Sequence, residues 1–255
     1  MNNNFYSDIF KRKSFHLFKN VGNDRITQSE LDGIVKAYDE FECLYPDIKT
    51  AVRIVPAAKI NFKRDAEYCV LIYSEKKDNY LMNAGFIGQQ LDLYPVHNNI
   101  GSLWYGLGKP DIANYNGLDF VIMFAIRKVN NNDLYRKDMF KAKRKDLKEI
   151  WQGDTLGVAE IARFAPSACN SQPWFVKNEN GKLTVYRYKK SAKIGILTPN
   201  AAAYFNRIDI GIFLCILEIC MAEKQLKFTK TLFSDFADGE YSKVLVCFFN
   251  FLHIY

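Results

Sequence analysis

Apolar residues recur at helical spacing in the first part of the chain. They lie at positions 31, 34, 35, 38 and 41, which places them on one side of a helix. Thr27 or Ser29 would cap this helix, with Glu30 at its start. A shorter helix, DIFKRKS, is expected before it, capped by Ser7 and Asp8 and cationic on its exposed side.

Short apolar runs predict strands in both parts of the chain. Each run alternates or is continuously apolar, is rich in β-branched and aromatic residues, and is bounded by polar segments. The expected strands lie within residues 52–55, 68–73, 119–127, 174–178, 182–188 and 241–251. Asn180-Gly181 separates two of them and predicts a tight hairpin turn.

Two longer apolar stretches, residues 80–92 and 204–226, are predicted to be helices. Gly85 and Gly88 lie inside the first, where each costs about 1 kcal/mol relative to alanine. We therefore expect another helix or a ligand to approach closely there. Charged residues interrupt the second stretch, which predicts a core helix and not a membrane span. These are Arg207, Asp209, Glu218 and Glu223.

The predicted elements occur in a similar order twice. A helix, hairpin strands, a long apolar helix and a strand occupy about residues 1–145, and the same order returns in residues 146–255. Residue identity between the halves is slight, so the repeat is weak as sequence evidence. The mixture predicts an α+β fold and a single domain over residues 1–255. An ordinary α+β domain with a coincidental order is the alternative.

The charge distribution limits the classes of partner. The 255 residues include 35 basic and 28 acidic side chains, a net charge of +7. Much of the basic excess lies in residues 11–13 and 141–148, and it would suit nucleic acid, an anionic membrane surface or an anionic small ligand. No recognised nucleic-acid-reading module accompanies it, so we expect neither nucleic acid nor a membrane as a partner.

Six cysteines are scattered without a CxxC pair, and only three histidines are present. This usage argues against a zinc site and against a disulfide scaffold. We therefore expect no metal and a reducing, cytoplasmic compartment. The N-terminal sequence MNNNFYSDIFKRK has no apolar core of the signal-peptide type.

Residues 161–174, IARFAPSACNSQPW, carry the most specific pattern. Apolar spacing from Ile150 to Ile161 predicts a helix that Pro166 stops. A polar loop follows, and Pro173 and Trp174 lead into the next strand. Such a loop can present hydroxyls, amides and backbone N–H groups to a polyoxygenated ligand. It can also be no more than a helix–strand connection anchored by a buried tryptophan.

The pattern P-S-x-x-N-x-Q-P-W resembles the flavin-contacting loop of the FMN-dependent nitroreductase family. The matching residues are Pro166, Ser167, Asn170, Gln172, Pro173 and Trp174. The segments NAGFIGQQLDL, GSLWYGLGKPD and KRKDLKEI extend the likeness to a fused branch of that family, along essentially the whole chain. This resemblance implies a nitroreductase-like fold whose two pseudo-symmetric halves, with mixed sheets and long central helices, form a pseudo-dimer in one chain. A monomer of this kind, or a weak homo-oligomer, is expected.

The resemblance also implies which residues bind FMN. The family's N-terminal R-x-S-x-R motif binds the phosphate, and Arg12 and Ser14 match it, with His16 in place of the second arginine and Lys13 beside it. The complete implied set is Arg12, Lys13, Ser14, His16, Trp104, Tyr105, Gly106, Lys141, Lys143, Arg144, Pro166, Ser167, Ala168, Asn170 and Gln172.

The remaining implied residues divide by role. Lys141, Lys143 and Arg144 would supply further cations for the phosphate. Residues 166–172 would contact the ribityl chain and the ring edge, and residues 104–106 would bring a backbone N–H near flavin N5. The family often has an acidic residue close to that glycine, and this sequence has none there.

The implied activity is that of an FMN-dependent oxidoreductase. NAD(P)H would reduce the flavin, which carries the chemistry without a catalytic side chain, and a nitroaromatic or quinone would alternate with it as the small-molecule acceptor. Residues 45–55 hold no second copy of the loop, so one FMN per chain is expected. The alternatives are a non-catalytic flavin-binding or sensor protein with this fold, and a basic nucleic-acid-binding domain.

Overall fold

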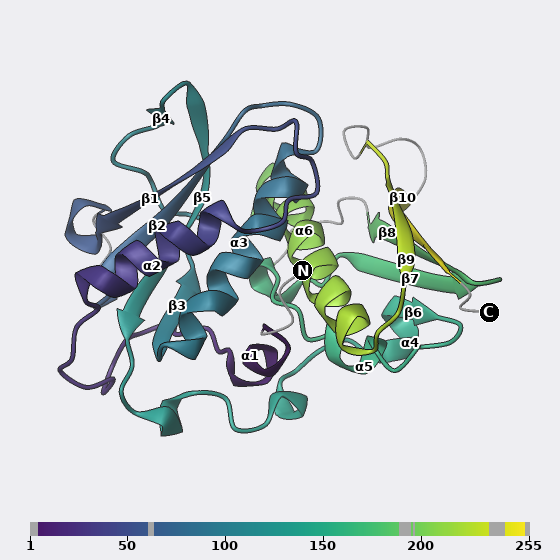
Figure 1. Cartoon of the computed structure of the whole chain (residues 1–255), viewed down its shortest axis with the longest axis horizontal. Helices are drawn as coiled ribbons and strands as arrows, with labels where there is room; N and C mark the ends of the chain where they lie inside the picture. The colour runs from purple at the N-terminus through teal and green to yellow at the C-terminus, as the bar shows by residue number, and fades with distance from the viewer. Residues whose placement is uncertain (1–4, 61–63, 189–194, 196, 235–242, 253–255) are drawn as a thin grey trace.

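The computed structural model describes residues 5–60, 64–188, 195, 197–234 and 243–252. Two long helices cross between two five-stranded sheets (Figure 1). The helices are α1 (Tyr6–Lys11), α2 (Gln28–Asp39), α3 (Tyr80–His97), α4 (Leu147–Ile150), α5 (Ala159–Ala162) and α6 (Pro199–Glu223). Short 3-10 helices are η2 (Ala57–Ile60), η3 (Asn132–Leu134), η4 (Met139–Lys141) and η5 (Ala168–Asn170). The predicted α+β class is confirmed.

The first sheet has the strand order β1-β2-β5-β3, and β4 also pairs with β5. Its strands are β1 (Thr50–Pro56), β2 (Tyr68–Ser74), β3 (Ile100–Trp104), β4 (Asn114–Tyr115) and β5 (Leu118–Lys128). All pairs are antiparallel, with Val70 opposite Phe124 and Leu103 opposite Ala125. Residues 69–73 of β2 and 121–126 of β5 are all buried, so these two central strands are core on both faces.

The second sheet has the order β6-β7-β8-β10-β9. Its strands are β6 (Trp151–Gln152), β7 (Trp174–Glu179), β8 (Lys182–Tyr188), β9 (Phe228–Leu232) and β10 (Lys243–Phe251). Apart from β4 in the first sheet and β6 in the second, the two orders correspond strand by strand, and α3 and α6 each follow the second of the four strands along the chain. The topology matches the predicted twofold order of elements; the pseudo-dimer itself stays a prediction.

The central helices touch through glycines. A Cβ on Gly85 of α3 would lie 2.0 Å from the Ile208 carbonyl oxygen, and one on Gly211 of α6 would lie 1.9 Å from the Met82 carbonyl oxygen. Only glycine fits such an approach of two backbones. The expected close approach is thus confirmed at Gly85. No helix among the described residues is both long and apolar enough to cross a membrane.

Several local predictions are confirmed, and one helix start is wrong. Thr27 and Glu30 form a reciprocal capping box at the start of α2. Asn180 and Gly181 have φ angles of 53° and 72°, as a tight hairpin turn requires. The first helix starts earlier than expected, at Tyr6, and its cap makes no side-chain hydrogen bond.

The continuous helix predicted from Ile150 to Ile161 is wrong. Gly153, Leu156 and Gly157 have φ angles of 88°, 54° and 63°, which a right-handed helix does not allow. Only α4 and α5 remain, and β6 between them pairs in parallel with β7. The apolar residues there are buried from two separate short helices. Their spacing in the sequence is the same as in one continuous helix, so periodicity alone does not distinguish the two cases.

Candidate functional site

A cavity of about 320 Å³ lies between β3, β5, the N-terminal half of α6 and the loop before β7. This volume is at the lower end of the range for small-molecule pockets. Three predicted segments that are far apart in the sequence meet at its wall. The predicted residues that line it are Ser14, His16, Trp104, Tyr105, Gly106, Pro166, Ser167 and Ala168.

Backbone pairing with β3 brings the N-terminal segment to this cavity. Ser14 forms an isolated parallel bridge with Ser102, and the Phe15 N–H donates to the Ser102 carbonyl at 2.9 Å. Gly101 permits this approach, because a Cβ there would lie 2.7 Å from the Phe15 ring. Side chains alternate along an extended segment, so buried Phe15 leaves Ser14 and His16 on the cavity side.

Asp92 of α3 connects two of the predicted segments. Its buried carboxylate accepts from Arg12 Nε at 2.7 Å and from Trp104 Nε1 at 3.1 Å, and it also accepts from the Ser102 hydroxyl. Bonds to an ionised acceptor are stronger than neutral ones. A single carboxylate therefore orients both the N-terminal arginine and the cavity tryptophan. The signal in the sequence is an aspartate at the end of a mostly apolar predicted helix.

Gly106 presents a backbone donor at the cavity wall. The Tyr105 N–H is bonded to the Met123 carbonyl at 2.9 Å, whereas the Gly106 N–H has no hydrogen-bond partner among the described residues. A Cβ on Gly106 would lie 2.6 Å from the Phe205 ring. Of the predicted segment 104–106, Gly106 is therefore the residue whose N–H is available to a ligand.

The loop before β7 has an unusual backbone. Cys169, Asn170 and Gln172 have φ angles of 50°, 55° and 46°, in the left-handed region. Ser167 Oγ accepts the Gln172 N–H at 3.0 Å, and Gln172 Oε1 accepts the Lys145 N–H at 3.0 Å. These bonds join the two ends of the loop and attach it to the basic segment of residues 141–148. The buried Gln172 side-chain amide is therefore already hydrogen-bonded to protein groups.

Asn170 lies at the exposed side of this loop, against the basic segment. Its Oδ1 accepts from Arg144 Nη1 at 2.9 Å, and its Nδ2 donates to the Lys143 carbonyl at 3.1 Å. Arg144 Nη2 also donates to the Phe164 carbonyl at 3.1 Å. Asn170 therefore orients Arg144 in this structure, while its direct contact with flavin stays a prediction.

Four arginines gather around this point: Arg12, Arg136, Arg144 and Arg163. Burial, together with the charges of the other three, lowers the pKa of Arg144 to about 10. Arg12 Nη2 and Arg144 Nε are buried and have no hydrogen-bond partner within the described part of the chain. A buried donor without an acceptor costs about 1–3 kcal/mol. This arginine cluster therefore has the chemistry of an anion site.

The side chains of the predicted lysines are exposed or bonded to other groups. Lys13 Nζ donates to the Leu134 carbonyl at 2.9 Å. The Lys141 side chain is 84% exposed, 4.0 Å from the Asp138 carboxylate, and Lys143 is exposed. Two arginines that the sequence analysis did not select complete the cluster instead. The phosphate roles of these lysines stay predictions.

Asp209 of α6 is a further cavity residue that the sequence analysis treated only as an interruption of an apolar run. Its two carboxylate oxygens accept the Ala168 N–H at 3.1 and 3.0 Å, and Oδ2 lies 3.2 Å from the Ser171 hydroxyl. Burial raises its pKa to about 8. Asp209 thereby fixes the loop before β7 to α6 and adds a carboxyl to the cavity wall.

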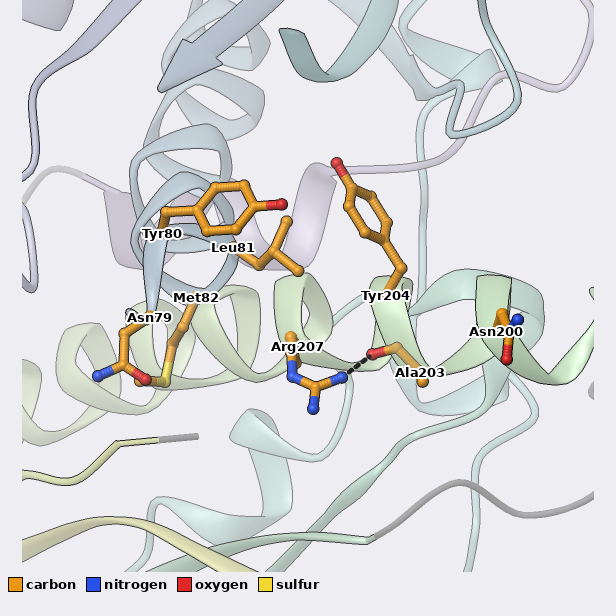
Figure 2. A pocket seen from close by; sticks show the side chains of 8 residues that line it. All are labelled: Asn79, Tyr80, Leu81, Met82, Asn200, Ala203, Tyr204 and Arg207. Atoms are coloured by element: carbon orange, nitrogen blue, oxygen red, sulfur yellow. Dashed lines mark hydrogen bonds between the residues drawn. The ribbon is translucent and has the colours of Figure 1, made fainter. Parts of the chain in front are cut away.

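A second pocket, of about 350 Å³, lies at the N-terminal ends of α3 and α6 (Figure 2). Tyr80 and Tyr204 enter it from the two helices, and Arg207 Nη1 donates to the Ala203 carbonyl at 2.9 Å. None of the predicted flavin residues lines it. We therefore locate the candidate site in the first cavity, on the other side of α6.

Comparison with known families agrees with this fold. The family model described as "Putative TM nitroreductase" matches residues 4–221. The chain therefore belongs to this nitroreductase family, and the family and fold support an oxidoreductase.

A crystal structure of a "putative nitroreductase" from Thermotoga maritima is similar, with a TM-score of 0.58 and 17% identity over 96% of this chain and 92% of that chain. At that identity the likeness shows the fold alone, and it confirms the nitroreductase-like fold. A search of curated proteins gave no match.

Proposed function

We propose that this chain is an FMN-dependent oxidoreductase that takes electrons from NAD(P)H and reduces a small nitroaromatic or quinone acceptor. The observation that carries the proposal is the partly buried arginine cluster, where the buried atoms Arg12 Nη2 and Arg144 Nε have no acceptor among the described residues. Arg12 is two residues from cavity residue Ser14, and Arg144 is bonded to the loop that lines the cavity. FMN has an anionic phosphate at one end and a largely apolar ring at the other, which matches this arrangement.

The phosphate would bind among the arginines. Asp92 already orients Arg12, and the Asn170 amide and the Phe164 carbonyl already orient Arg144. Guanidinium groups that are fixed in advance lose little freedom when they grip a phosphate with two parallel hydrogen bonds. A dianion would satisfy the buried N–H groups and offset both the burial and the repulsion that together lower the pKa of Arg144.

The flavin ring would occupy part of the cavity, and the acceptor would bind beside it. Most of the cavity wall is apolar and would exclude water from the ring: Leu103, Ile122, Leu197, Phe205, Ile208 and Ile212. The Gly106 N–H would donate to the ring's polar edge, where negative charge develops on reduction. When bound, FMN would supply hydride transfer between NAD(P)H and the acceptor.

One FMN per chain is proposed, in a monomeric pseudo-dimer or a weak homo-oligomer. Two features support this: the corresponding strand orders of the two sheets, and the single copy of the PSxxNxQPW loop. Residues 45–55, which occupy the corresponding place in the first half, contain no such loop.

The absorption spectrum of the purified protein, followed by NAD(P)H oxidation with and without an added quinone, tests this function. We expect the yellow spectrum of bound flavin and acceptor-dependent NAD(P)H oxidation. Bound flavin without any such oxidation would favour the non-catalytic flavin-binding alternative. A colourless protein that takes up no added FMN would reject the proposal.

A further inference from the structure

Asp209 brings a buried carboxyl to the wall of the cavity. It is 3% exposed, and Phe205, Ile208 and Ile212 of the same helix line the cavity with it. Its described partners are the Ala168 N–H and the Ser171 hydroxyl, and neither is a cation. An ionised carboxylate here would be desolvated without a compensating positive charge, which favours the neutral acid.

The charged groups around this cavity do not alter that balance. Those that line it with Asp209 are His16 and Arg64, both on exposed residues. Arg64 donates to the His16 carbonyl at 3.4 Å, and its guanidinium lies 5.9 Å from the Tyr105 ring centre. On α6 itself, Arg207 lines the other pocket. Burial therefore dominates and raises the pKa of Asp209 to about 8.

We infer that Asp209 is the proton donor to the electron acceptor that binds in this cavity, an inference that rests on the proposed flavin function. Bound FMN, once reduced by NAD(P)H, would supply the hydride for the acceptor. The Asp209 O–H bond breaks as an O–H bond forms on a quinone oxygen, leaving a carboxylate. Hydride and proton together balance the two-electron reduction of a quinone to a quinol.

Ser171 provides a route for the proton to return. Its hydroxyl lies 3.2 Å from Asp209 Oδ2 and 3.5 Å from Asn206 Oδ1, and the residue is partly exposed. A hydroxyl accepts a proton from solvent on one side while it donates to the carboxylate on the other. The Ala168 N–H, shared by both carboxylate oxygens, stabilises the ionised form in the interval.

Asp209→Asn separates this role from a structural one. The amide oxygen still accepts the Ala168 N–H, but the acidic proton is lost. Reoxidation of bound FMN by a benzoquinone should slow by about 100-fold or more, and this loss should far exceed any change in the rate at which NAD(P)H reduces the bound FMN. The matched control is Asp133→Asn, a carboxyl with a 79% exposed side chain that does not line the cavity.

The pH dependence gives a second test. The wild-type rate of quinone reduction should fall as the pH rises through about 8, because only the protonated acid donates. Ser171→Ala removes a hydrogen bond that lowers this pKa, so the fall should move to higher pH. In flavin-free protein, the infrared carbonyl band of protonated Asp209 should persist to about pH 8, which is a readout independent of turnover.

The possible failures are distinct. A carbonyl band that disappears near pH 4, or an Asp209→Asn protein that reduces quinone at the wild-type rate, would overturn the inference. A protein that binds no FMN would reject the proposed function instead. If Asp209→Asn does not fold, the wild-type infrared titration and the direction of the Ser171→Ala shift still decide.

Discussion

Arg12 donates through Nε to Asp92 at 2.7 Å, and both side chains are almost completely buried. Removing one partner of such a pair leaves an uncompensated charge and costs about 3–5 kcal/mol. Asp92→Asn should therefore lower the free energy of unfolding in urea by about that amount. The double variant Arg12→Met/Asp92→Asn should lose clearly less than the sum of the two single losses.

The exposed pair of Lys137 and Asp133 is the control, with side chains 73% and 79% exposed. Lys137→Met should change stability by no more than about 1 kcal/mol. Additive losses at Arg12 and Asp92 would show that the two residues act independently, contrary to the geometry.

Gly106→Ala tests the close packing of the cavity wall. The new Cβ would lie 2.6 Å from the Phe205 ring, so the ring or the backbone must move into the space proposed for flavin. We expect FMN affinity, measured by fluorescence titration, to fall about tenfold or more, which is roughly 1.4 kcal/mol. Gly33→Ala in α2 is the control, because its Cβ would have an ordinary 3.4 Å contact. Unchanged FMN affinity in Gly106→Ala would place the ring elsewhere.

Asn170→Gly tests whether the Asn170 side-chain amide contributes to FMN binding. Asn170 has φ 55°, which glycine adopts without strain, whereas leucine would strain the loop and confuse the result. Loss of the Arg144 contact at 2.9 Å should weaken FMN binding by about 1–3 kcal/mol. Melting of the flavin-free form should change little because the residue is exposed. A large drop in that melting temperature with unchanged FMN affinity would show that the segment PSACNSQPW has only a structural role.

Asp209 should make the stability of the flavin-free protein depend on pH. Its pKa is raised from 3.8 to about 8 on folding, so the stabilisation is complete below about pH 4 and is lost as the pH rises through 8. Urea unfolding should show wild type losing up to about 1.4 kcal/mol per pH unit relative to Asp209→Asn across this window. Parallel pH profiles for the two proteins would mean that Asp209 is ionised in the folded state.

The helices and strands with strong periodicity could be predicted from the sequence, and the weaker ones could not. The two long helices, the α2 capping box and the Asn180-Gly181 turn follow from local patterns. The start of β3, Ile100-Gly101-Ser102, has the composition of a loop. Its glycine is needed for close contact with the Phe15 ring and does not form a turn. β9, at Phe228–Leu232, is a short edge strand and left no clear signal in the sequence analysis.

The site was predictable as segments but not as a network. Residues near Ser14, Trp104 and Pro166 could be selected by resemblance, and the fold brings them to one cavity. Asp92 and Asp209 were missed, because their roles depend on partners that are distant in the sequence. The arginines at 136 and 163 were missed for the same reason, since a basic run gives no information on which side chains become buried together.

The most direct test of the account is calorimetric titration of the flavin-free protein with FMN and with riboflavin, which lacks the phosphate. The variant is Arg144→Met, and the control is Lys137→Met, whose side chain is 73% exposed and which is not among the predicted flavin residues. We predict one FMN per chain, with Arg144→Met weakening FMN by about 1.5–3 kcal/mol while leaving riboflavin binding nearly unchanged, and with Lys137→Met changing neither affinity. Two FMN per chain, or an equal loss of FMN and riboflavin affinity in Arg144→Met, would contradict phosphate binding by the arginine cluster.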